Sequence, residues 1–119
     1  MKESFILKTI LDGLAAKRIF AGRLNTGGGK VLGGYFHAHG FGKGAADILA
    51  FPVFIVSVPM IAQSSIERIV PCWIEVKSDR GRQSAEQKSF EIHVRSQGHE
   101  YLLVKSWEEV ENWLKEHGL

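Results

Sequence analysis

Two hydrophobic periodicities alternate along this chain, and their order limits the folds that it can adopt. Apolar residues recur at helical spacing near both ends and once between, whereas short apolar runs typical of strands separate these segments. We expect helices at 3–18, 84–97 and 106–118, and strands at 19–25, 30–39, 47–58, 66–77 and 101–105. This order predicts an α/β fold in which a single mixed β-sheet is flanked by helices.

Local signals sharpen several of these boundaries. Ser84 and Gln87 have the spacing of a capping box at the start of the second helix, and Ser106 and Glu109 repeat that spacing at the third. Segment 27–29 consists of three glycines, which predicts a turn that pairs strand 19–25 with strand 30–39 as a hairpin.

Length and composition restrict the class of protein. With 119 residues and one cysteine, Cys72, the chain fits one domain without an internal disulfide, as is typical of a reducing cytosol. The longest apolar run, 48–62, is short for a membrane span and contains Pro52 and Pro59. We therefore expect a cytoplasmic protein, of a bacterium or a virus-infected cell, that has no membrane partner.

The net charge of +2 conceals an uneven distribution. Segment 106–119 contains four glutamates and one lysine, so basic side chains outnumber acidic ones by five in the rest of the chain. A basic excess of this size is compatible with a nucleic-acid partner but also occurs in proteins that never contact DNA.

The segment 72–78 carries the strongest chemical signal. Side chains alternate between the two faces of a strand, so Glu75 and Lys77 project together while Ile74 and Val76 project to the other side. A solvated edge strand would explain such a pair. The preceding Cys-Trp-Ile run instead favours an interior strand, with both charges at its carboxyl end.

Asp47 is the second candidate acid. It follows a loop of small residues, 42–46, and precedes an apolar strand. A carboxylate at such a position is often a turn cap. Beside Glu75 on a neighbouring strand, it would instead supply oxygen ligands for a hard cation such as Mg²⁺.

Two more polar residues continue inward-facing helical stripes. Gln87 lies on the same helical face as Phe90 and Val94, although the capping box alone explains its presence. Glu3 continues the inner stripe of the first helix, although an acid in a first helical turn is also favoured by the helix dipole. Both are candidate members of the site.

Two other motifs are weaker. His37 and His39 would share a strand face, as a zinc site needs, but no further clustered ligand accompanies them. The run 29–31 lacks the spacing and hydroxyl residue of a phosphate-binding P-loop.

Together these residues resemble the virus-type replication-repair nuclease (VRR-NUC) family of the PD-(D/E)XK nuclease superfamily. The resemblance covers most of the chain and is most specific at Ile74-Glu75-Val76-Lys77 and at Gly81-Arg82-Gln83-Ser84-Ala85-Glu86-Gln87. Two features depart from it: Ala46 stands where a proline often precedes the family aspartate, and the gap from Asp47 to Glu75 is long.

The resemblance implies a single nuclease domain over residues 1–119, with a restriction-endonuclease-like core of order α-β-β-β-α-β and a C-terminal helix. It implies a Mg²⁺-dependent endodeoxyribonuclease, in which Mn²⁺ substitutes and no organic cofactor takes part. Asp47, Glu75 and the Val76 carbonyl would hold metal, while Lys77 assists the attacking water and Glu3 and Gln87 complete the catalytic set.

Standalone members of this family resemble dimeric resolvases that cut branched DNA such as four-way (Holliday) junctions, so the resemblance implies a homodimer acting on such DNA. A monomeric nicking, flap or restriction-type nuclease and a catalytically idle DNA-binding module remain alternatives. An inserted hairpin at about 52–70 is a hypothetical interface with a second subunit. The candidate DNA contacts are Arg23, Asn25, Lys30, Lys43, Arg80, Arg82 and Lys88.

Overall fold

The computed structural model describes residues 2–24, 28–31, 34–37, 41–58 and 64–119. Three helices form, α1 (Glu3–Ala16), α2 (Ala85–Ser96) and α3 (Trp107–Glu116), each within one or two residues of a segment with helical periodicity. Ser84 accepts a hydrogen bond from the Gln87 amide, and the Gln87 side chain accepts one from Ser84 in return. This reciprocal pair confirms the predicted capping box of α2.

The central sheet in the described part of the chain has four strands in the order β1-β4-β7-β8. These strands are β1 (Phe20–Arg23), β4 (Ile48–Phe51), β7 (Cys72–Val76) and β8 (Glu100–Val104). The β1–β4 and β4–β7 pairs are antiparallel, whereas β7 and β8 are parallel and joined through α2. The predicted α/β domain with one mixed sheet and three helices is therefore confirmed.

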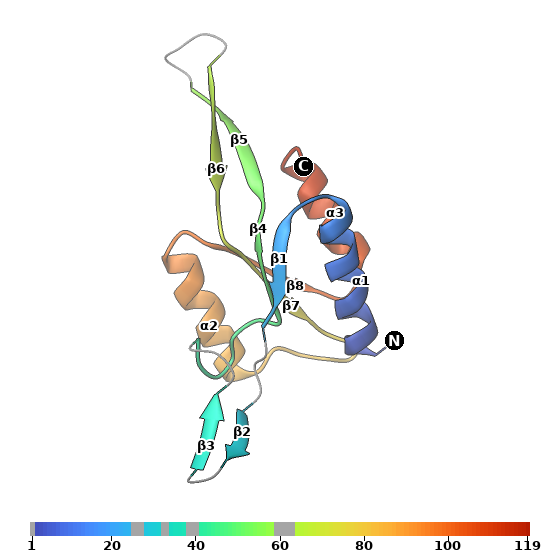
Figure 1. The fold of residues 1–119 in the computed structure, drawn as a ribbon, viewed down its shortest axis with the longest axis vertical. Helices are drawn as coiled ribbons and strands as arrows, with labels where there is room; N and C mark the ends of the chain where they lie inside the picture. Colours follow the sequence, from blue (N-terminus) through green and yellow to red (C-terminus); the bar gives the residue numbers. More distant parts are fainter. Residues whose placement is uncertain (1, 25–27, 32–33, 38–40, 59–63) are drawn as a thin grey trace.

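Two hairpins project from opposite ends of this sheet (Figure 1). One contains β2 (Gly28–Val31) and β3 (Gly34–His37), and the other contains β5 (Val53–Ser57) and β6 (Ser65–Ile69). The molecule is consequently elongated, with principal extents of 60 × 30 × 24 Å.

The predicted pairing of strand 19–25 with strand 30–39 is wrong. β1 pairs with β4, and the segment 28–37 closes on itself as the β2–β3 hairpin. Two residues separate β2 from β3, and this is the commonest spacing between the strands of a hairpin. Because β2 and β3 pair with each other, β1 pairs with the apolar β4 instead.

Two prolines divide strands that were predicted to be continuous. Pro52 separates β4 from β5, and Pro71 precedes β7 after β6 has ended at Ile69. Proline has no amide hydrogen for the ladder and fixes its own φ, so the chain leaves the central sheet at these positions. The result is the β5–β6 hairpin, which spans 53–69 between two core strands.

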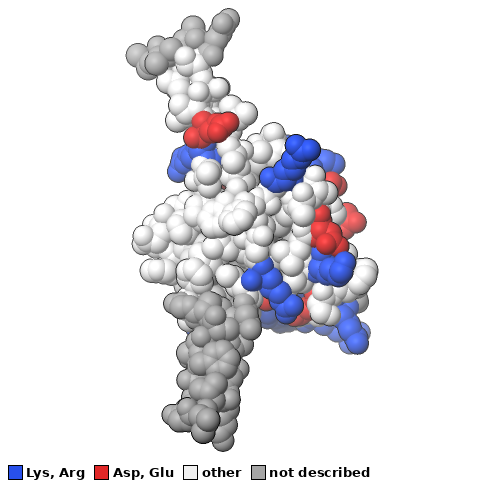
Figure 2. Space-filling model, in the orientation of Figure 1, with Lys and Arg blue, Asp and Glu red and all other residues white. Residues whose placement is uncertain are grey.

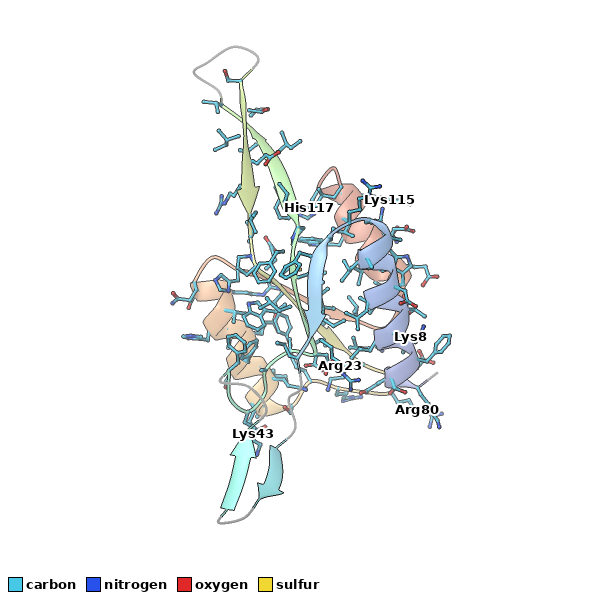
Figure 3. The ribbon with its side chains drawn as sticks, viewed as in Figure 1. Lys8, Arg23, Lys43, Arg80, Lys115 and His117 are labelled. Atoms are coloured by element: carbon cyan, nitrogen blue, oxygen red, sulfur yellow. The ribbon has the colours of Figure 1, made fainter. Side chains whose placement is uncertain are left out.

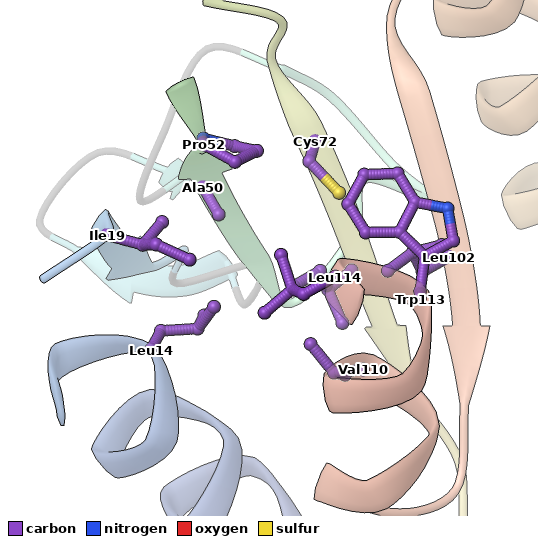
Figure 4. Close-up of a pocket in the computed structure, with 10 residues that line it drawn as sticks. Leu14, Ile19, Ala50, Pro52, Cys72, Leu102, Val110, Trp113 and Leu114 are labelled. Carbon is purple, nitrogen blue, oxygen red and sulfur yellow. The ribbon is translucent and has the colours of Figure 1, made fainter. Parts of the chain in front are cut away.

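Strand alternation distributes the core over both faces of the sheet. Cys72, Ile74 and Val76 pack with α1 and α3, whereas Trp73 packs on the opposite face with Val94 of α2. The small cavity in Figure 4 lies on the α1–α3 side and has only apolar lining residues, so it belongs to the core. Among the described helices, none has both the length and the apolar character needed to cross a membrane.

Candidate active site

One edge of the sheet gathers the chain's candidate chemical groups. The carboxyl ends of β1, β7 and β8 lie there with the start of β4, because β4 runs antiparallel to β1 and β7. Figure 1 shows that the N-terminal ends of α1 and α2 reach the same edge, which is the lower one in that view. We call it the site edge.

Glu75 is the central residue of this edge. Its side chain is only 3% exposed, and its Oε2 lies 3.8 Å from the Nζ of Lys77, whose side chain is 13% exposed. Alternation along β7 puts Glu75 on the same face as Trp73, which packs against α2, and the short distance to Lys77 agrees with the prediction that the two side chains project together. In the described part of the chain, the Glu75 Oε1 atom is buried without a hydrogen-bond partner.

Asp47 lies immediately before β4, next to Glu75. The pairing of Ile48 with Ile74, continued by one residue, sets Asp47 opposite Glu75. The Val76 amide donates a 2.8 Å hydrogen bond to Asp47 Oδ2, and the Asp47 amide donates to the Ile74 carbonyl at 3.1 Å. Hydrogen bonds to the β7 backbone therefore fix the position of Asp47, whereas the sequence predicted only that Asp47 lies near Glu75.

The two carboxyl groups interact strongly. Burial is the main cause that raises the pKa of Glu75, and a side-chain hydrogen bond with Asp47 and the charge of Asp47 raise it as well; against the opposing charge of Lys77, the pKa reaches about 8. Glu75 therefore tends to retain its proton at neutral pH unless additional positive charge arrives. A buried carboxyl oxygen without a partner, close to a second carboxylate, has the chemistry of an oxygen-ligand cation site.

Glu3 reaches the same edge from the first turn of α1. Its Oε1 accepts a 3.3 Å hydrogen bond from the Ser78 amide, directly after Lys77. A Cβ at Gly81 would lie 3.3 Å from Glu3 Oε1 and 3.2 Å from the Cβ of Lys77, so the loop after β7 folds closely over both side chains. The charge of Glu3 also contributes to the raised pKa of Glu75.

Gln87 is held by its own helix. Its Oε1 accepts a 2.8 Å hydrogen bond from the Ser84 amide, so the side-chain oxygen serves the capping box. The capping interpretation of Gln87 therefore describes its present contact. The residue nevertheless lies close to the loop that leads to Asp47, because Gly44 packs against the backbone of Glu86 and Gln87.

Gly44 has a structural role that the sequence did not specify. Its φ is +87°, and a Cβ there would lie 2.4 Å from the Glu86 carbonyl oxygen. Only glycine fits this contact, which docks the loop before Asp47 onto the start of α2. The glycine-rich composition of that loop was the available signal.

Tyr101 is a neighbour that the sequence analysis treated only as a strand residue. It is buried on β8 beside Trp73, and its hydroxyl accepts a 3.2 Å hydrogen bond from Gln83. Burial is the main cause that raises its pKa, to about 12, with smaller contributions from the charges of Glu75 and Asp47 and an opposing one from the Gln83 hydrogen bond. Tyr101 therefore lies close enough to Glu75 and Asp47 to interact with their charges.

Basic side chains lie around the site edge. Figure 3 shows Arg23 at the end of β1 between Lys43 and Arg80. Lys43 lies 3.5 Å from a Glu86 carboxylate oxygen and remains 82% exposed. Four other candidate DNA contacts are exposed as well: Arg23, Arg80, Arg82 and Lys88. Asn25 lies outside the described residues, and Lys30 is placed only as part of the β2 backbone.

The predicted site thus comes together in part. Asp47, Glu75, Lys77 and Glu3 share one edge, and Gln87 lies in the adjoining helix turn. No group of three His, Cys, Asp or Glu side chains that could hold a metal ion occurs among the described residues. Of the two histidines considered for zinc, His37 is placed only as part of the β3 backbone, and His39 lies outside the described residues.

The arrangement offers two adjacent carboxylates and a lysine ammonium at the mouth of a sheet. Such a set can bind a divalent cation and can stabilise negative charge that develops on a nearby phosphoryl oxygen. Comparison of this chain with models of known protein families, with curated proteins and with solved structures finds no match.

Proposed function

We propose that this chain is a metal-dependent DNA endonuclease whose active centre contains Asp47, Glu75 and Lys77. The observation that carries the proposal is the buried Glu75 carboxyl, whose Oε1 atom has no hydrogen-bond partner among the described residues and whose neighbours are Asp47 and Lys77. A carboxyl group with only a structural role would stabilise the fold more if it were exposed or fully hydrogen-bonded, because burying an incompletely bonded acid costs stability. A bound cation would interact with this oxygen and offset that cost.

The order of elements supports a PD-(D/E)XK-type core. Three strands of the central sheet, β1, β4 and β7, follow α1, and then α2 leads to β8, which lies parallel to β7. This is the α-β-β-β-α-β order that the resemblance to the VRR-NUC family implies, with α3 as the added C-terminal helix. The β2–β3 and β5–β6 hairpins are additions to that core.

The donor set fits a magnesium ion. The carboxylates of Asp47 and Glu75 and the Val76 carbonyl would hold it, and Mn²⁺ would substitute because it accepts the same oxygen ligands. When bound, such an ion supplies an activated water and neutralises phosphate charge. Its positive charge would also favour loss of the Glu75 proton, which burial and Asp47 now favour keeping.

Lys77 is positioned by its backbone as well as by Glu75. Its amide donates a 2.9 Å hydrogen bond to the Val104 carbonyl, which fixes the residue at the end of β7 beside β8. Its ammonium would orient the attacking water and stabilise charge that builds on the phosphorus substituents. Glu3 restrains the following loop through Ser78, and Gln87 would contribute once its side chain leaves the cap.

The exposed basic residues around the site edge would contact the DNA backbone. Phosphate contacts position a substrate without reading its sequence, so the proposed selectivity is for DNA shape. Four-way junctions are the substrate class that we favour. Symmetric resolution of a junction needs two active centres, and a domain with one centre would meet that need as a two-fold homodimer.

Cleavage assays test this proposal. Labelled four-way junction, flap and linear duplex are incubated with the protein in Mg²⁺, in Mn²⁺ or in EDTA. We expect cleavage only with metal and fastest on the junction. Cleavage in EDTA would contradict the metal-dependent mechanism. Equal rates on all three substrates would contradict shape selectivity, and metal-independent binding without cleavage would favour an idle DNA-binding module.

A further inference from the structure

A shallow hollow lies between the loop before β4 and the first turns of α2. It has a volume of about 390 Å³ and is lined by Lys43, Ala85, Glu86, Ser89 and Phe90. Ala85 and Ser89 are four positions apart on α2, as are Glu86 and Phe90, so the helix presents these four residues on one face. The fifth residue, Lys43, comes from the loop. We call this feature the α2 hollow.

Phe90 gives the α2 hollow an aromatic surface. Its ring packs edge-on with Trp73 of β7, with a centroid distance of 5.0 Å and an interplanar angle of 83°. A second contact joins the ring to Tyr101 of β8 at a centroid distance of 6.4 Å. These contacts leave Phe90 half-buried, and it still lines the hollow. The sheet therefore holds the ring in place while part of it can contact a ligand.

Polar groups with different roles surround that ring. Glu86 supplies a carboxylate acceptor, and Ser89, about one turn further along α2, supplies a hydroxyl that can donate or accept. The Nζ of Lys43 lies 3.5 Å from the Glu86 carboxylate, and both side chains are exposed. An exposed ion pair of this kind contributes little to stability, so its exchange for a contact between Lys43 and a phosphate costs little.

The α2 hollow adjoins the site edge. Trp73, which contacts Phe90, precedes Glu75 by two positions on the same face of β7, a separation of about 7 Å. The loop that carries Lys43 leads directly to Asp47. Figure 2 shows predominantly basic side chains along the lower border of the described surface, where the site edge lies. A ligand of the hollow would thus reach the proposed active centre, in surroundings that favour a polyanion.

An aromatic ring, a cation and hydrogen-bonding groups side by side match the parts of a nucleotide. The base can stack on the ring while the phosphate pairs with the lysine. In a duplex the face of each base is covered by its neighbours, so only an unpaired nucleotide can present one to the protein. A carboxylate at the edge of the base favours an exocyclic amino group, as in cytosine, over the carbonyl oxygen that thymine has at that position.

We propose that the α2 hollow binds an unpaired nucleotide of the DNA substrate, with its base against Phe90 and its phosphate at Lys43, and that Glu86 favours cytosine over thymine. The choice of DNA as the ligand rests on the proposed function. The inference narrows the substrate class to DNA that exposes an unpaired nucleotide close to the cleaved bond, as an opened branch point does. A fully paired duplex would not occupy the hollow.

Fluorescence anisotropy of labelled single-stranded oligonucleotides in EDTA tests the proposal without cleavage. Oligodeoxycytidine should bind about fivefold more tightly than oligodeoxythymidine of the same length. Ser89→Leu fills the hollow from an exposed helical position and should weaken binding of oligodeoxycytidine about tenfold. Ser96→Leu is the matched control, because Ser96 is an exposed serine in the last turn of α2 and does not line the hollow. Circular dichroism checks that each variant retains its fold.

Two further positions test the individual contacts. Phe90→Leu should weaken binding of oligodeoxycytidine about tenfold, whereas Phe90→Tyr keeps an aromatic ring and should bind as the unaltered protein does. Glu86→Gln should abolish the preference for cytosine, because a glutamine amide can donate to thymine as well as accept from cytosine.

The outcomes separate this proposal from the nuclease proposal. Equal affinity for the two oligonucleotides, unchanged binding in Ser89→Leu and Phe90→Leu, or equal losses in Ser89→Leu and Ser96→Leu would overturn the proposed nucleotide site, even in a protein that cleaves DNA with Mg²⁺. The predicted pattern of binding in a protein that cleaves no DNA with Mg²⁺ would support the nucleotide site and contradict the nuclease.

Discussion

The buried Glu75 carboxyl should make the protein less stable as the pH rises when no metal is present. Its pKa is about 8 in the folded chain and 4.5 in the reference state. A group whose folded-state pKa is raised contributes stability that is fully present below the unfolded value and is lost as the pH rises through the folded value. At about 1.4 kcal/mol for each pH unit, the loss between pH 4.5 and 8 has a ceiling of about 5 kcal/mol.

Glu75→Gln removes this ionisation while preserving the side-chain size. We expect the variant and the unaltered protein to have similar free energies of unfolding near pH 5. At pH 9 in EDTA the variant should be more stable by several kcal/mol, within that ceiling. Urea unfolding followed by tryptophan fluorescence at pH 5, 7 and 9 measures the difference. At each pH, the transition midpoint multiplied by the slope m gives the free energy of unfolding of each protein.

Glu116→Gln, which alters an exposed acid at the end of α3, is the control for a general change of net charge. It should leave the pH dependence of unfolding unchanged. A stability difference between Glu75→Gln and the unaltered protein that stays constant from pH 5 to 9 would refute the reasoning. A variant that becomes relatively less stable as the pH rises would refute its sign.

Three further predictions test other parts of the structure. Saturating Mg²⁺ at pH 8 should raise the free energy of unfolding of the unaltered protein, by about 3 kcal/mol at a hundredfold excess over the dissociation constant, and should not raise that of Glu75→Gln. Gly44→Ala should cost at least about 1 kcal/mol more than Gly98→Ala in urea unfolding, because both glycines have positive φ but only at Gly44 would the added Cβ collide with a backbone carbonyl, that of Glu86; equal costs would contradict the docking role. Burial raises the pKa of the Cys72 thiol to about 12, so at pH 8 it should react with Ellman's reagent only as fast as the chain unfolds, and rapid labelling of the folded protein would contradict its placement in the core.

Local patterns predicted the elements and the central pair of the site. The pairing of Glu75 with Lys77 follows from strand alternation, and the start of α2 follows from Ser84 and Gln87, since both depend on residues close in sequence. Strand partnership could not be predicted in the same way. The choice of β4 as partner of β1 depends on contacts about 30 residues apart, and the glycines of 27–29 suggested a nearer partner.

The sequence also left the exact setting of the site undefined. No local pattern shows that the Val76 amide fixes Asp47, that Glu3 reaches Ser78, or that one Glu75 oxygen is buried without a partner in the described part of the chain. These features arise only when three segments that are distant in sequence, the start of α1, the start of β4 and the end of β7, meet at one edge.

The single-turnover cleavage rate of a labelled four-way junction by Lys77→Ala tests the central claim most directly. Lys115→Ala is the matched control, since Lys115 is an exposed lysine on α3 that pairs with Glu111 and has no place in the proposed site. With Mg²⁺ we expect Lys77→Ala to bind the junction normally and to cleave it about 10²–10³-fold more slowly, with only a small effect of Lys115→Ala. Equal cleavage rates for Lys77→Ala and the unaltered protein would contradict an active centre built on Asp47, Glu75 and Lys77.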